Sequence, residues 1–198
     1  MDVRRSVSTT GDVEALRQRL LEHCAALSPA LFGWAHLRIK RFLNVHVEAE
    51  DIVQETWLRA LASVTADTDR LLETDALRAW VFGIAQRVLL EEVRRSGASR
   101  GSMDATATSM FARQADTVTS ICTGLARHET VRLFLRFADE LEDLDRELLV
   151  RCAFEDVSAS DVGRRLGVEP AAAIKRWQRL RERLQTLRLD ERLGLKGA

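Results

Sequence analysis

Apolar residues recur every three or four positions along most of this 198-residue chain, which is the spacing of one face of an α-helix. The clearest stripe lies in residues 77–98 and consists of Leu77, Trp80, Val81, Ile84 and Val88. The alternation typical of β-strands does not occur in the sequence, and only 2 prolines and 10 glycines interrupt the helical pattern. We therefore expect an all-α protein.

The face opposite this stripe is basic and polar. Its members are Arg78, Gln86, Arg87, Arg94 and Arg95, with Trp80 near the edge. Guanidinium groups and an aromatic ring on one rigid helix suit a nucleic-acid backbone and an unstacked base. An ordinary amphipathic helix with a solvated face has the same pattern, so this helix alone does not decide the function.

Composition divides the chain into two halves. Residues 97–120 are rich in Ser, Thr, Ala and Gly and poor in large apolar residues, which indicates a flexible linker. We expect two small helical domains, at 12–96 and 121–190, joined by this linker. A disordered lead over 1–11 and a tail over 191–198 complete the expected organisation.

Capping and turn residues predict where individual helices begin and end. Ser28 and Pro29 predict that one helix ends and another starts, because Ser caps helices and Pro fits the first turn. Residues 121–139 fit a single helix. Ser158 or Ser160 can cap a later short helix that ends before Gly167, in the pattern of a helix-turn-helix.

Another helix is expected over residues 49–64. Asp51 and Glu55 point away from its apolar stripe, and Gln54 and Leu58 lie beside them. A leucine exposed among carboxylates and an amide is either a stray surface residue or part of a contact surface for a basic or polar partner helix. Both interpretations stay open at this point.

The last long helix of the second half starts at Pro170. Its apolar stripe is Ala173, Trp177, Leu180, Leu184 and Leu187. The opposite face begins with small residues and continues with amide and basic ones: Ala171, Ala172, Lys175, Gln178, Arg179 and Arg183. Small residues followed by basic ones suit close approach to a DNA major groove.

Charge is separated along the second half, although the whole chain is neutral with 30 basic and 30 acidic residues. Residues 139–156 contain eight acids and two bases, whereas residues 164–188 contain eight bases and two acids. We expect the basic block to bind DNA, since it follows a helix-turn-helix pattern. The acidic block is then expected to face away from DNA, toward solvent or another protein.

The sequence does not support a disulfide-bonded protein, an enzyme, a metal-binding protein or a membrane protein. Cys24, Cys122 and Cys152 lie far apart without a CxxC pair and are expected to be free, buried residues. The four histidines form no HExxH motif, and there is no nucleophile elbow or phosphate-binding glycine loop. We expect no catalytic centre, no metal site and no cofactor. Without a signal-peptide run or a stretch of about 18 apolar residues, a cytoplasmic protein with no membrane insertion is expected.

Two separated blocks resemble one family, the sigma-70 sigma factors of bacterial RNA polymerase. Region 2 of that family resembles residues 49–61, AEDIVQETWLRAL, and the following LRAWVFGIAQRVLLEEVRR. Region 4 resembles residues 141–184, LEDLDRELLVRCAFEDVSASDVGRRLGVEPAAAIKRWQRLRERL. Two such regions on a short linker, without a middle domain, are similar to the extracytoplasmic-function (ECF) group.

The resemblance implies a promoter-specificity subunit that is not an enzyme. In the family, the DxVQE surface binds the clamp helices of the polymerase β′ subunit. The matching residues here are Asp51, Gln54 and Glu55, with Leu58 adjacent. Region 4 also contacts the β-subunit flap, through an apolar surface that the resemblance does not assign to residues.

The resemblance implies promoter DNA as the second partner. Region 2 opens the minus-ten element and holds a flipped base, and the residues implied are Trp80, Gln86, Arg87, Arg94 and Arg95. Region 4 reads the minus-thirty-five element as duplex, and the residues implied are Ala171, Ala172, Lys175, Arg176 and Arg179.

This chain departs from the family pattern at two places. The family usually has Arg-Asn where Gln86-Arg87 stands, and a basic-serine pair where Ile174-Lys175 stands; Ile174 is expected at the border of the buried stripe. Two alternatives remain: a sigma-like decoy that occupies an anti-sigma factor, and a stand-alone helix-turn-helix repressor. Many ECF factors are held by an anti-sigma factor, which makes such an inhibitor a further candidate partner.

Overall fold

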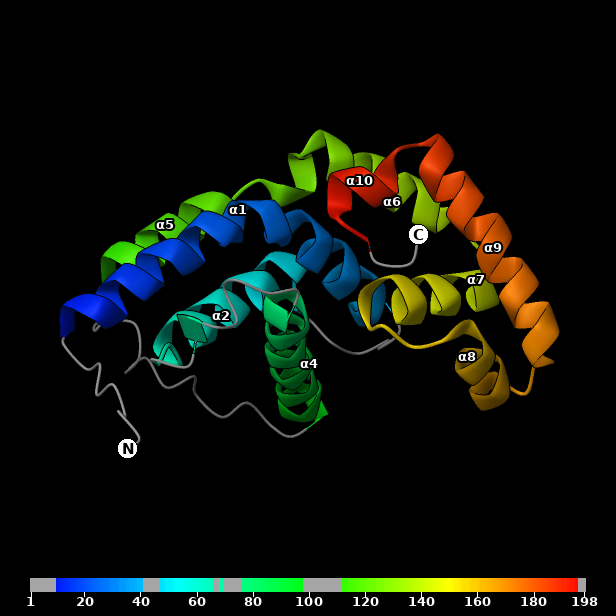
Figure 1. Ribbon diagram of the computed structural model, residues 1–198, viewed down its shortest axis with the longest axis horizontal. Helices are drawn as coiled ribbons and strands as arrows, with labels where there is room; N and C mark the ends of the chain where they lie inside the picture. The colour runs from blue at the N-terminus through cyan, green and yellow to red at the C-terminus, as the bar shows by residue number, and fades with distance from the viewer. Residues whose placement is uncertain (1–9, 41–46, 66–67, 70–75, 98–111, 196–198) are drawn as a thin grey trace, which may run out of the picture.

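The computed structural model describes residues 10–40, 47–65, 68–69, 76–97 and 112–195, and this part of the chain contains helices and no strand (Figure 1). The all-α class is thereby confirmed. The α-helices are α1 (Thr10–Ile39), α2 (Ala49–Ala62), α4 (Ala76–Gly97), α5 (Ala112–Cys122), α6 (Glu129–Asp139), α7 (Asp143–Leu148), α8 (Ala159–Leu166), α9 (Pro170–Thr186) and α10 (Leu189–Leu193). A 3₁₀ turn, η3 (Leu125–Arg127), precedes α6, and a π-helical segment, η4 (Leu149–Phe154), continues α7.

Helix α1 connects the two halves of the molecule. It contacts α2, α4 and α5 on one side and α6, η4 and α10 further along (Figure 1). The predicted break at Ser28-Pro29 is wrong, because α1 continues through both residues. The Ser28 hydroxyl, which was expected to cap a helix, instead accepts a hydrogen bond at 2.9 Å from the indole nitrogen of Trp57 in α2.

Burial on both sides of Pro29 explains why α1 does not break there. A proline inside a helix removes one backbone hydrogen bond and is unfavourable. Leu20 lies before the proline and Leu31 and Trp34 after it, and all three side chains are at most 1% exposed. Keeping α1 in one piece places both segments in the same core, and this burial outweighs the local penalty.

Part of the expected linker is helical. Residues 112–122 form α5, which packs against α1 and α2 through the buried side chains of Ala115, Val118 and Cys122. Residues 98–111 of the expected linker, and the lead up to residue 9, lie outside the described part of the chain. The expected tail also takes part in packing, since Leu193 in α10 and Leu195 are buried.

The single helix expected over residues 121–139 is interrupted. After α5 the chain turns through Gly124, whose φ is +89°, and then forms η3 before α6 begins at Glu129. Glycine adopts such a left-handed conformation without the steric penalty that a Cβ brings. The turn lets α5 pack in the first half of the molecule while α6 packs along a later part of α1.

The predicted helix-turn-helix is confirmed in α8 and α9. The Ser158 hydroxyl accepts a hydrogen bond from the Asp161 amide and caps α8, and Gly167 ends it with a φ of +70°. Pro170 occupies the first turn of α9. A Cβ built on Gly163 would lie 2.9 Å from the Cβ of Ala173, so the close approach of the two helices depends on glycine there.

All three cysteines are free and buried, as expected. Burial raises the pKa of the Cys24 thiol to about 11 and that of Cys122 and Cys152 to about 12. The three thiols are therefore protonated and unreactive near neutral pH. Among the described residues, no helix has the length and apolar character that a membrane crossing requires.

Candidate functional site

The acidic surface expected on α2 consists of Asp51, Gln54, Glu55 and Leu58, which we call the α2 ridge. Asp51 is exposed, but the other three side chains, including the leucine expected to be exposed, are half-buried. They are partly covered because neighbouring helices lie on both flanks of the ridge. It nonetheless presents a carboxylate, an amide and an apolar group side by side on one helix.

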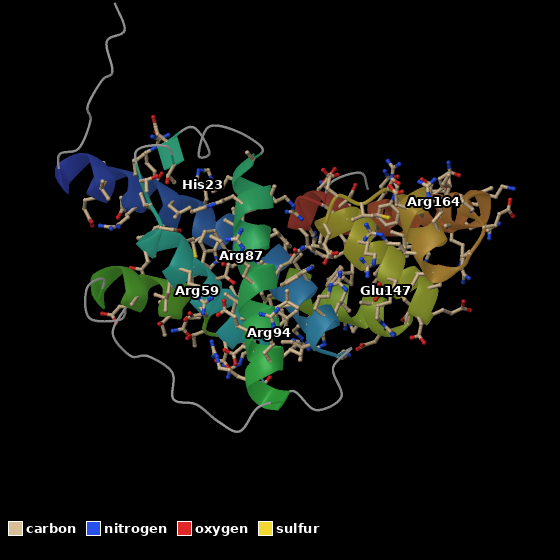
Figure 2. The ribbon with its side chains drawn as sticks, turned by 90° about the horizontal axis from the view of Figure 1, so that it is seen from below. His23, Arg59, Arg87, Arg94, Glu147 and Arg164 are labelled. Atoms are coloured by element: carbon tan, nitrogen blue, oxygen red, sulfur yellow. The ribbon has the colours of Figure 1, made fainter. Side chains whose placement is uncertain are left out.

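On the flank toward α4, charged groups hold the ridge in place. Glu55 accepts a hydrogen bond at 2.6 Å from Arg59, and Arg59 forms an ion pair at 2.7 Å with Glu91 of α4. Burial of the Arg59 guanidinium opposes its charge, but the hydrogen bonds to Glu55 and Glu91 outweigh this and raise its pKa. Arg59, labelled in Figure 2, thus links α2 to α4.

On the other flank, α5 contacts the ridge. The side-chain amide of Gln54 donates a hydrogen bond to the Thr119 hydroxyl at 2.9 Å. This contact was not expected, since Thr119 fell in the predicted linker. The residues are 65 positions apart, and no local pattern indicates such a pair.

Helix α4 presents an exposed row next to the ridge. Gln86, Arg87, Leu90 and Arg94 are exposed, and Figure 2 shows Arg87 and Arg94 along the same helix. Neither arginine forms an ion pair with any residue that the structure describes. Arg87 and Arg94 are therefore the cations of α4 that remain available to a phosphate backbone.

The other basic residues expected on this face are less available. Arg95 is half-buried and pairs with Glu91 at 3.6 Å and with Glu92 on its own helix. Trp80 is half-buried against the core.

Arg78 does not lie on the exposed face, and that expectation is wrong. Its guanidinium carbon lies 4.8 Å from the centroid of the Phe82 ring, and Nη1 lies 3.5 Å from the Leu193 carbonyl oxygen. Burial lowers the Arg78 pKa to about 10. The reason is tertiary: α10 lies beside the start of α4 and covers this arginine, which sequence spacing alone does not reveal.

Helix α9 carries the second expected nucleic-acid surface. Ala171, Lys175 and Arg179 are exposed, and Ala172 is half-buried. Within the described ranges, Lys175 and Arg179 have no ion-pair partner. A start lined by alanines leaves room for a groove wall to approach the helix.

Arg176, also expected on this surface, is held by the acidic block. It donates to Asp145 at 2.9 Å and to Glu142, and the hydrogen bond to Glu142 is the main reason that its pKa is raised. Arg183 lies 3.7 Å from Glu140 and 5.0 Å from the ring centroid of Phe137. These acids therefore face α9 instead of turning away from the basic block.

Two apolar side chains also differ from expectation on this face. Ile174 was expected at the border of the buried stripe but is 40% exposed, and Leu187, expected in the stripe, is 37% exposed. The buried stripe of α9 ends at Leu184, because α9 stops at Thr186 and the chain turns toward α10. Ile174 is thus available beside Lys175 for an external contact.

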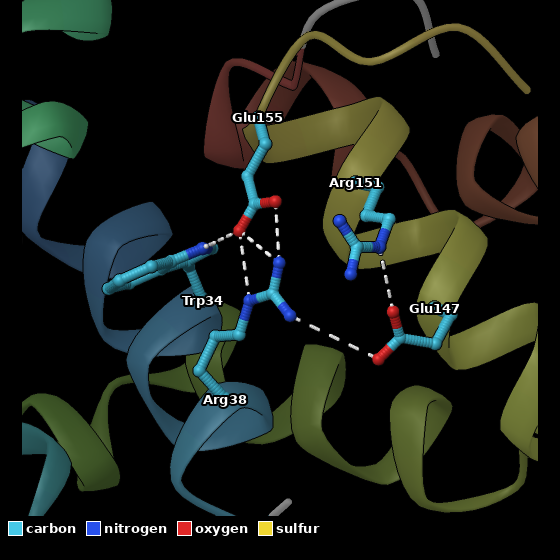
Figure 3. A network of polar contacts seen from close by, with 5 residues as sticks. All are labelled: Trp34, Arg38, Glu147, Arg151 and Glu155. Atoms are coloured by element: carbon cyan, nitrogen blue, oxygen red, sulfur yellow. Dashed lines mark hydrogen bonds and ion pairs between the residues drawn. The ribbon is translucent and has the colours of Figure 1, made fainter. Parts of the chain in front are cut away.

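A network of polar contacts joins the two halves (Figure 3). Glu155 accepts hydrogen bonds at 2.9 Å from the Trp34 indole and at 2.9 Å from Arg38 Nε, and Arg38 Nη2 reaches both of its carboxylate oxygens. Glu147 lies 4.0 Å from Arg38 Nη1 and accepts a hydrogen bond from Arg151 at 2.8 Å. The Glu155 and Arg38 side chains are only 8% and 13% exposed.

Sequence reasoning missed this junction. Arg38 and Glu155 are 117 positions apart, and each looks like an ordinary surface charge in the sequence. The centroid of the Phe82 ring lies 5.9 Å from that of Trp34 and 6.0 Å from that of Phe154, so aromatic packing accompanies the ion pair. Next to it, Gln86 and Arg78 line a small cavity of about 160 Å³ between α4 and residues 153–156.

The structure therefore brings two of the three expected sites together. The α2 ridge and the exposed row of α4 are neighbours linked by Arg59 and Glu91, whereas the exposed face of α9 belongs to the other half. In the part of the chain that is described, no group of three or more His, Cys, Asp or Glu residues is placed to hold a metal ion.

Comparison with protein families finds a match in the first half of the chain. Residues 26–99 match the family model of Sigma-70 region 2. No curated protein and no solved structure matches the chain. The matched segment contains the second part of α1 together with all of α2 and α4. The segment that carries the α2 ridge and the exposed row of α4 is thus similar to region 2 of the sigma-70 family.

Proposed function

We propose that this chain is an RNA polymerase sigma factor of the ECF group, which directs core polymerase to specific promoters and begins to melt them. The observation that carries the proposal is the match of residues 26–99 to Sigma-70 region 2, together with the α2 ridge and the cations of α4 on adjacent helices of that segment. In this proposal the chain is a binding and positioning subunit and not an enzyme.

The α2 ridge is proposed to bind the clamp helices of the β′ subunit. Asp51 offers a carboxylate in water, Gln54 an amide, and Leu58 a half-buried apolar surface. A partner helix with basic and apolar side chains gains a charge interaction at the rim and excludes water at the leucine. Glu55 supports this surface through its hydrogen bond to Arg59.

The exposed row of α4 is proposed to hold the melted minus-ten element. Flipping a base out of the duplex costs a few kcal/mol. Contacts to the captured strand offset this, since a stacked base contributes about 1–3 kcal/mol. Arg87 and Arg94 are proposed to neutralise phosphates, with Gln86 beside them and Trp80 and Arg95 in supporting positions.

The exposed face of α9 is proposed to read the minus-thirty-five element as duplex. Ala171 and Ala172 allow close approach, and Lys175 and Arg179 contact phosphates or base edges. Arg176 lies beside this face, and its guanidinium donates hydrogen bonds to Asp145 and Glu142. In this proposal Arg176 therefore has a supporting role in DNA binding. The same half is proposed to contact the β flap.

Run-off transcription tests the proposal. Core polymerase, fragmented genomic DNA and the intact chain are expected to give promoter-dependent transcripts. The double variant Asp51→Ala/Gln54→Ala is expected to lose them together with binding to core. Asp143→Ala is the matched control, because the Asp143 side chain is fully exposed in α7, away from the ridge.

The outcomes separate the proposal from its alternatives. Absence of both transcript and core binding by the intact chain contradicts it. Tight binding to duplex DNA without polymerase would identify a repressor, and binding to an anti-sigma factor without any transcript would identify a decoy.

A further inference from the structure

Ile174 is an apolar side chain on a helix face that otherwise carries small, amide and charged residues. It is 40% exposed and lies next to Lys175, which is also exposed. We propose that Ile174 determines base specificity by contacting the C5-methyl group of a thymine in the major groove of the duplex that α9 reads. This inference rests on the proposed function of α9 and deepens it, because it names a base that the chain prefers and the side chain that prefers it.

The first step is the position of Ile174 along α9. In a helix-turn-helix, the N-terminal residues of the second helix contact the edges of the bases. Helix α9 begins at Pro170, and Ile174 lies four residues, or about 6 Å, further along the axis. Ala171 is exposed three residues before Ile174 on the same side of the helix, and its small side chain leaves room for the bases. Ile174 therefore lies in the part of α9 that reaches base edges.

The second step is the direction in which Ile174 points. Successive residues of an α-helix are about 100° apart, so Ile174 and Arg176 point about 200° apart around α9. Arg176 donates hydrogen bonds to Glu142 and Asp145, and α7 lies on the inner side of α9 (Figure 1). Ile174 therefore points away from these acids, whose charge would repel phosphates.

The third step is the charge beside Ile174. Lys175 and Arg179 are exposed one turn apart, and neither forms an ion pair with a residue in the described ranges. Two such cations favour a phosphate backbone on this side of α9. Glu182 is also exposed on this side, but it lies eight residues, or about 12 Å, beyond Ile174 and far from the start of the helix. The surroundings of Ile174 thus suit the groove that the backbone borders.

The fourth step is the chemistry of the major groove. The base edges there present hydrogen-bond donors and acceptors, and the C5-methyl group of thymine is the apolar exception. Isoleucine has no polar group in its side chain, so covering the polar edge of another base would remove water without replacing its hydrogen bonds. Against thymine, the same side chain removes two apolar groups from water at once. An isoleucine at this point of α9 therefore favours thymine.

The size of the expected preference follows from one buried apolar carbon. Such a group contributes about 0.8 kcal/mol, which is about fourfold in binding. Deoxyuridine in place of the contacted thymine removes only the C5-methyl group and keeps the pairing with adenine. We therefore expect this replacement to weaken binding of the intact chain about fourfold. The same replacement is expected to leave binding of Ile174→Ala unchanged, because the partner of the methyl group is already missing.

A binding selection followed by methyl deletion tests the inference. The intact chain, alone and in complex with core polymerase, is incubated with a library of duplexes of random sequence, and the bound duplexes are sequenced. The selected sequences are expected to share a thymine that Ile174→Ala no longer selects. The selected duplex is then prepared with deoxyuridine at each shared thymine in turn, and fluorescence anisotropy measures its affinity for the intact chain and for Ile174→Ala.

Leu187→Ala is the matched control. Leu187 is 37% exposed, which is close to the exposure of Ile174, but it follows the last residue of α9 and lies far from the base-reading end. This variant is expected to keep both the affinity of the original chain and its response to deoxyuridine. Helical circular dichroism verifies that the variants are folded. If Ile174→Ala does not fold, Ile174→Val decides in its place, with a response to deoxyuridine smaller than that of the original chain.

The outcomes distinguish this inference from the proposed function. The inference is wrong if deoxyuridine at every shared thymine leaves the affinity of the intact chain unchanged, or if Ile174→Ala responds as strongly as the original chain. It is also wrong if no duplex is selected with or without core polymerase, since Ile174 would then serve a contact other than DNA. Methyl-dependent binding by a chain that gives no run-off transcript supports the thymine contact and contradicts the sigma factor. Transcripts from a promoter whose thymines all tolerate deoxyuridine give the reverse result.

Discussion

Two arginine–glutamate ion pairs that involve the second half have the same chemistry but differ in how far water reaches them. The Arg38–Glu155 pair between α1 and the end of η4 is nearly buried, at 13% and 8% side-chain exposure. The Arg176–Glu142 pair between α9 and the start of α7 lies in water, at 35% and 75%. Burial decides what each pair does, because water screens the second and not the first.

The comparison indicates a division of roles. The buried pair fixes how the two halves meet, since its loss leaves a charge inside the molecule. The exposed pair hardly affects the fold but sets how much positive charge α9 offers to a ligand. The same contrast separates Arg78, which is covered by α10, from Arg87 and Arg94, which are exposed on the same helix.

The buried pair gives the largest expected effect. Glu155→Ala leaves Arg38 and the Trp34 indole without their carboxylate, and it is expected to lower the free energy of unfolding by about 3–5 kcal/mol. Urea denaturation of the variant and of the exposed-site control Asp143→Ala measures the difference. A loss as small as that of the control would show that the junction does not depend on this pair.

The cations of α4 come next. The double variant Arg87→Ala/Arg94→Ala is expected to bind single-stranded promoter DNA about tenfold more weakly, which corresponds to about 1.4 kcal/mol. The slope of log affinity against log salt concentration is expected to become shallower by about 1 for each phosphate that the variant no longer neutralises. Fluorescence anisotropy at several salt concentrations measures both. Arg78→Ala is the control and is expected to leave the slope unchanged, because Arg78 is covered; an equal change in slope would contradict the division between covered and exposed arginines.

Two substitutions at the start of α8 compare how much a capping hydroxyl and an exposed ion pair contribute to the free energy of unfolding. Ser158 accepts from the Asp161 amide and donates to the Asp161 carboxylate at 2.6 Å, and Arg164 pairs with that carboxylate at 2.5 Å. Ser158→Ala is expected to lower the free energy of unfolding by about 1 kcal/mol. Arg164→Ala is expected to change it much less.

The stability lost in Ser158→Ala is expected to depend on pH in a defined direction. The hydrogen bond from Ser158 and then the hydrogen bond from Arg164 lower the Asp161 pKa below its ordinary value of 3.8. The stabilisation from the ionised carboxylate is therefore fully present above pH 3.8 and is lost as the pH falls through the lower folded pKa. The difference between the original chain and Ser158→Ala should shrink in that acidic range, and a difference independent of pH would show that the carboxylate takes no part.

The exposed pair gives the smallest effect on stability. Glu142→Gln/Asp145→Asn removes both partners of Arg176 and is expected to change the free energy of unfolding by at most about 1 kcal/mol. Because Arg176 is then free to meet phosphate, affinity for duplex promoter DNA is expected to rise about twofold to fivefold. Weaker DNA binding would mean that the acids position Arg176 instead of neutralising it.

Local patterns predicted the helical class, the turn of the helix-turn-helix and the start of α9 correctly. Ser158, Gly167 and Pro170 act through their own backbone or the next turn, so sequence spacing is enough to find them. Ser28 and Pro29 carry an equally good local signal, yet α1 continues, because burial of its two segments in one core outweighs the local preference.

The availability of each site residue was less predictable. The exposure of Gln86, Arg87, Arg94, Lys175 and Arg179 follows from helical periodicity. The cover on Arg78, the acids on Arg176 and the contact of Thr119 with Gln54 each come from a helix distant in the sequence. Periodicity gives the face of a helix, but it does not say which other helix lies against that face.

The sequence by itself determined that this chain is helical, where α8 is capped and ends and where α9 begins, and which helix faces carry charge, because those properties depend on residues within a few turns of one another. Only the tertiary structure decided which arginines are free, that part of the expected linker is a helix against the α2 ridge, and that Arg38 meets Glu155. Those outcomes depend on which distant surfaces become buried together, and burial sets the strength of every charge and hydrogen bond involved.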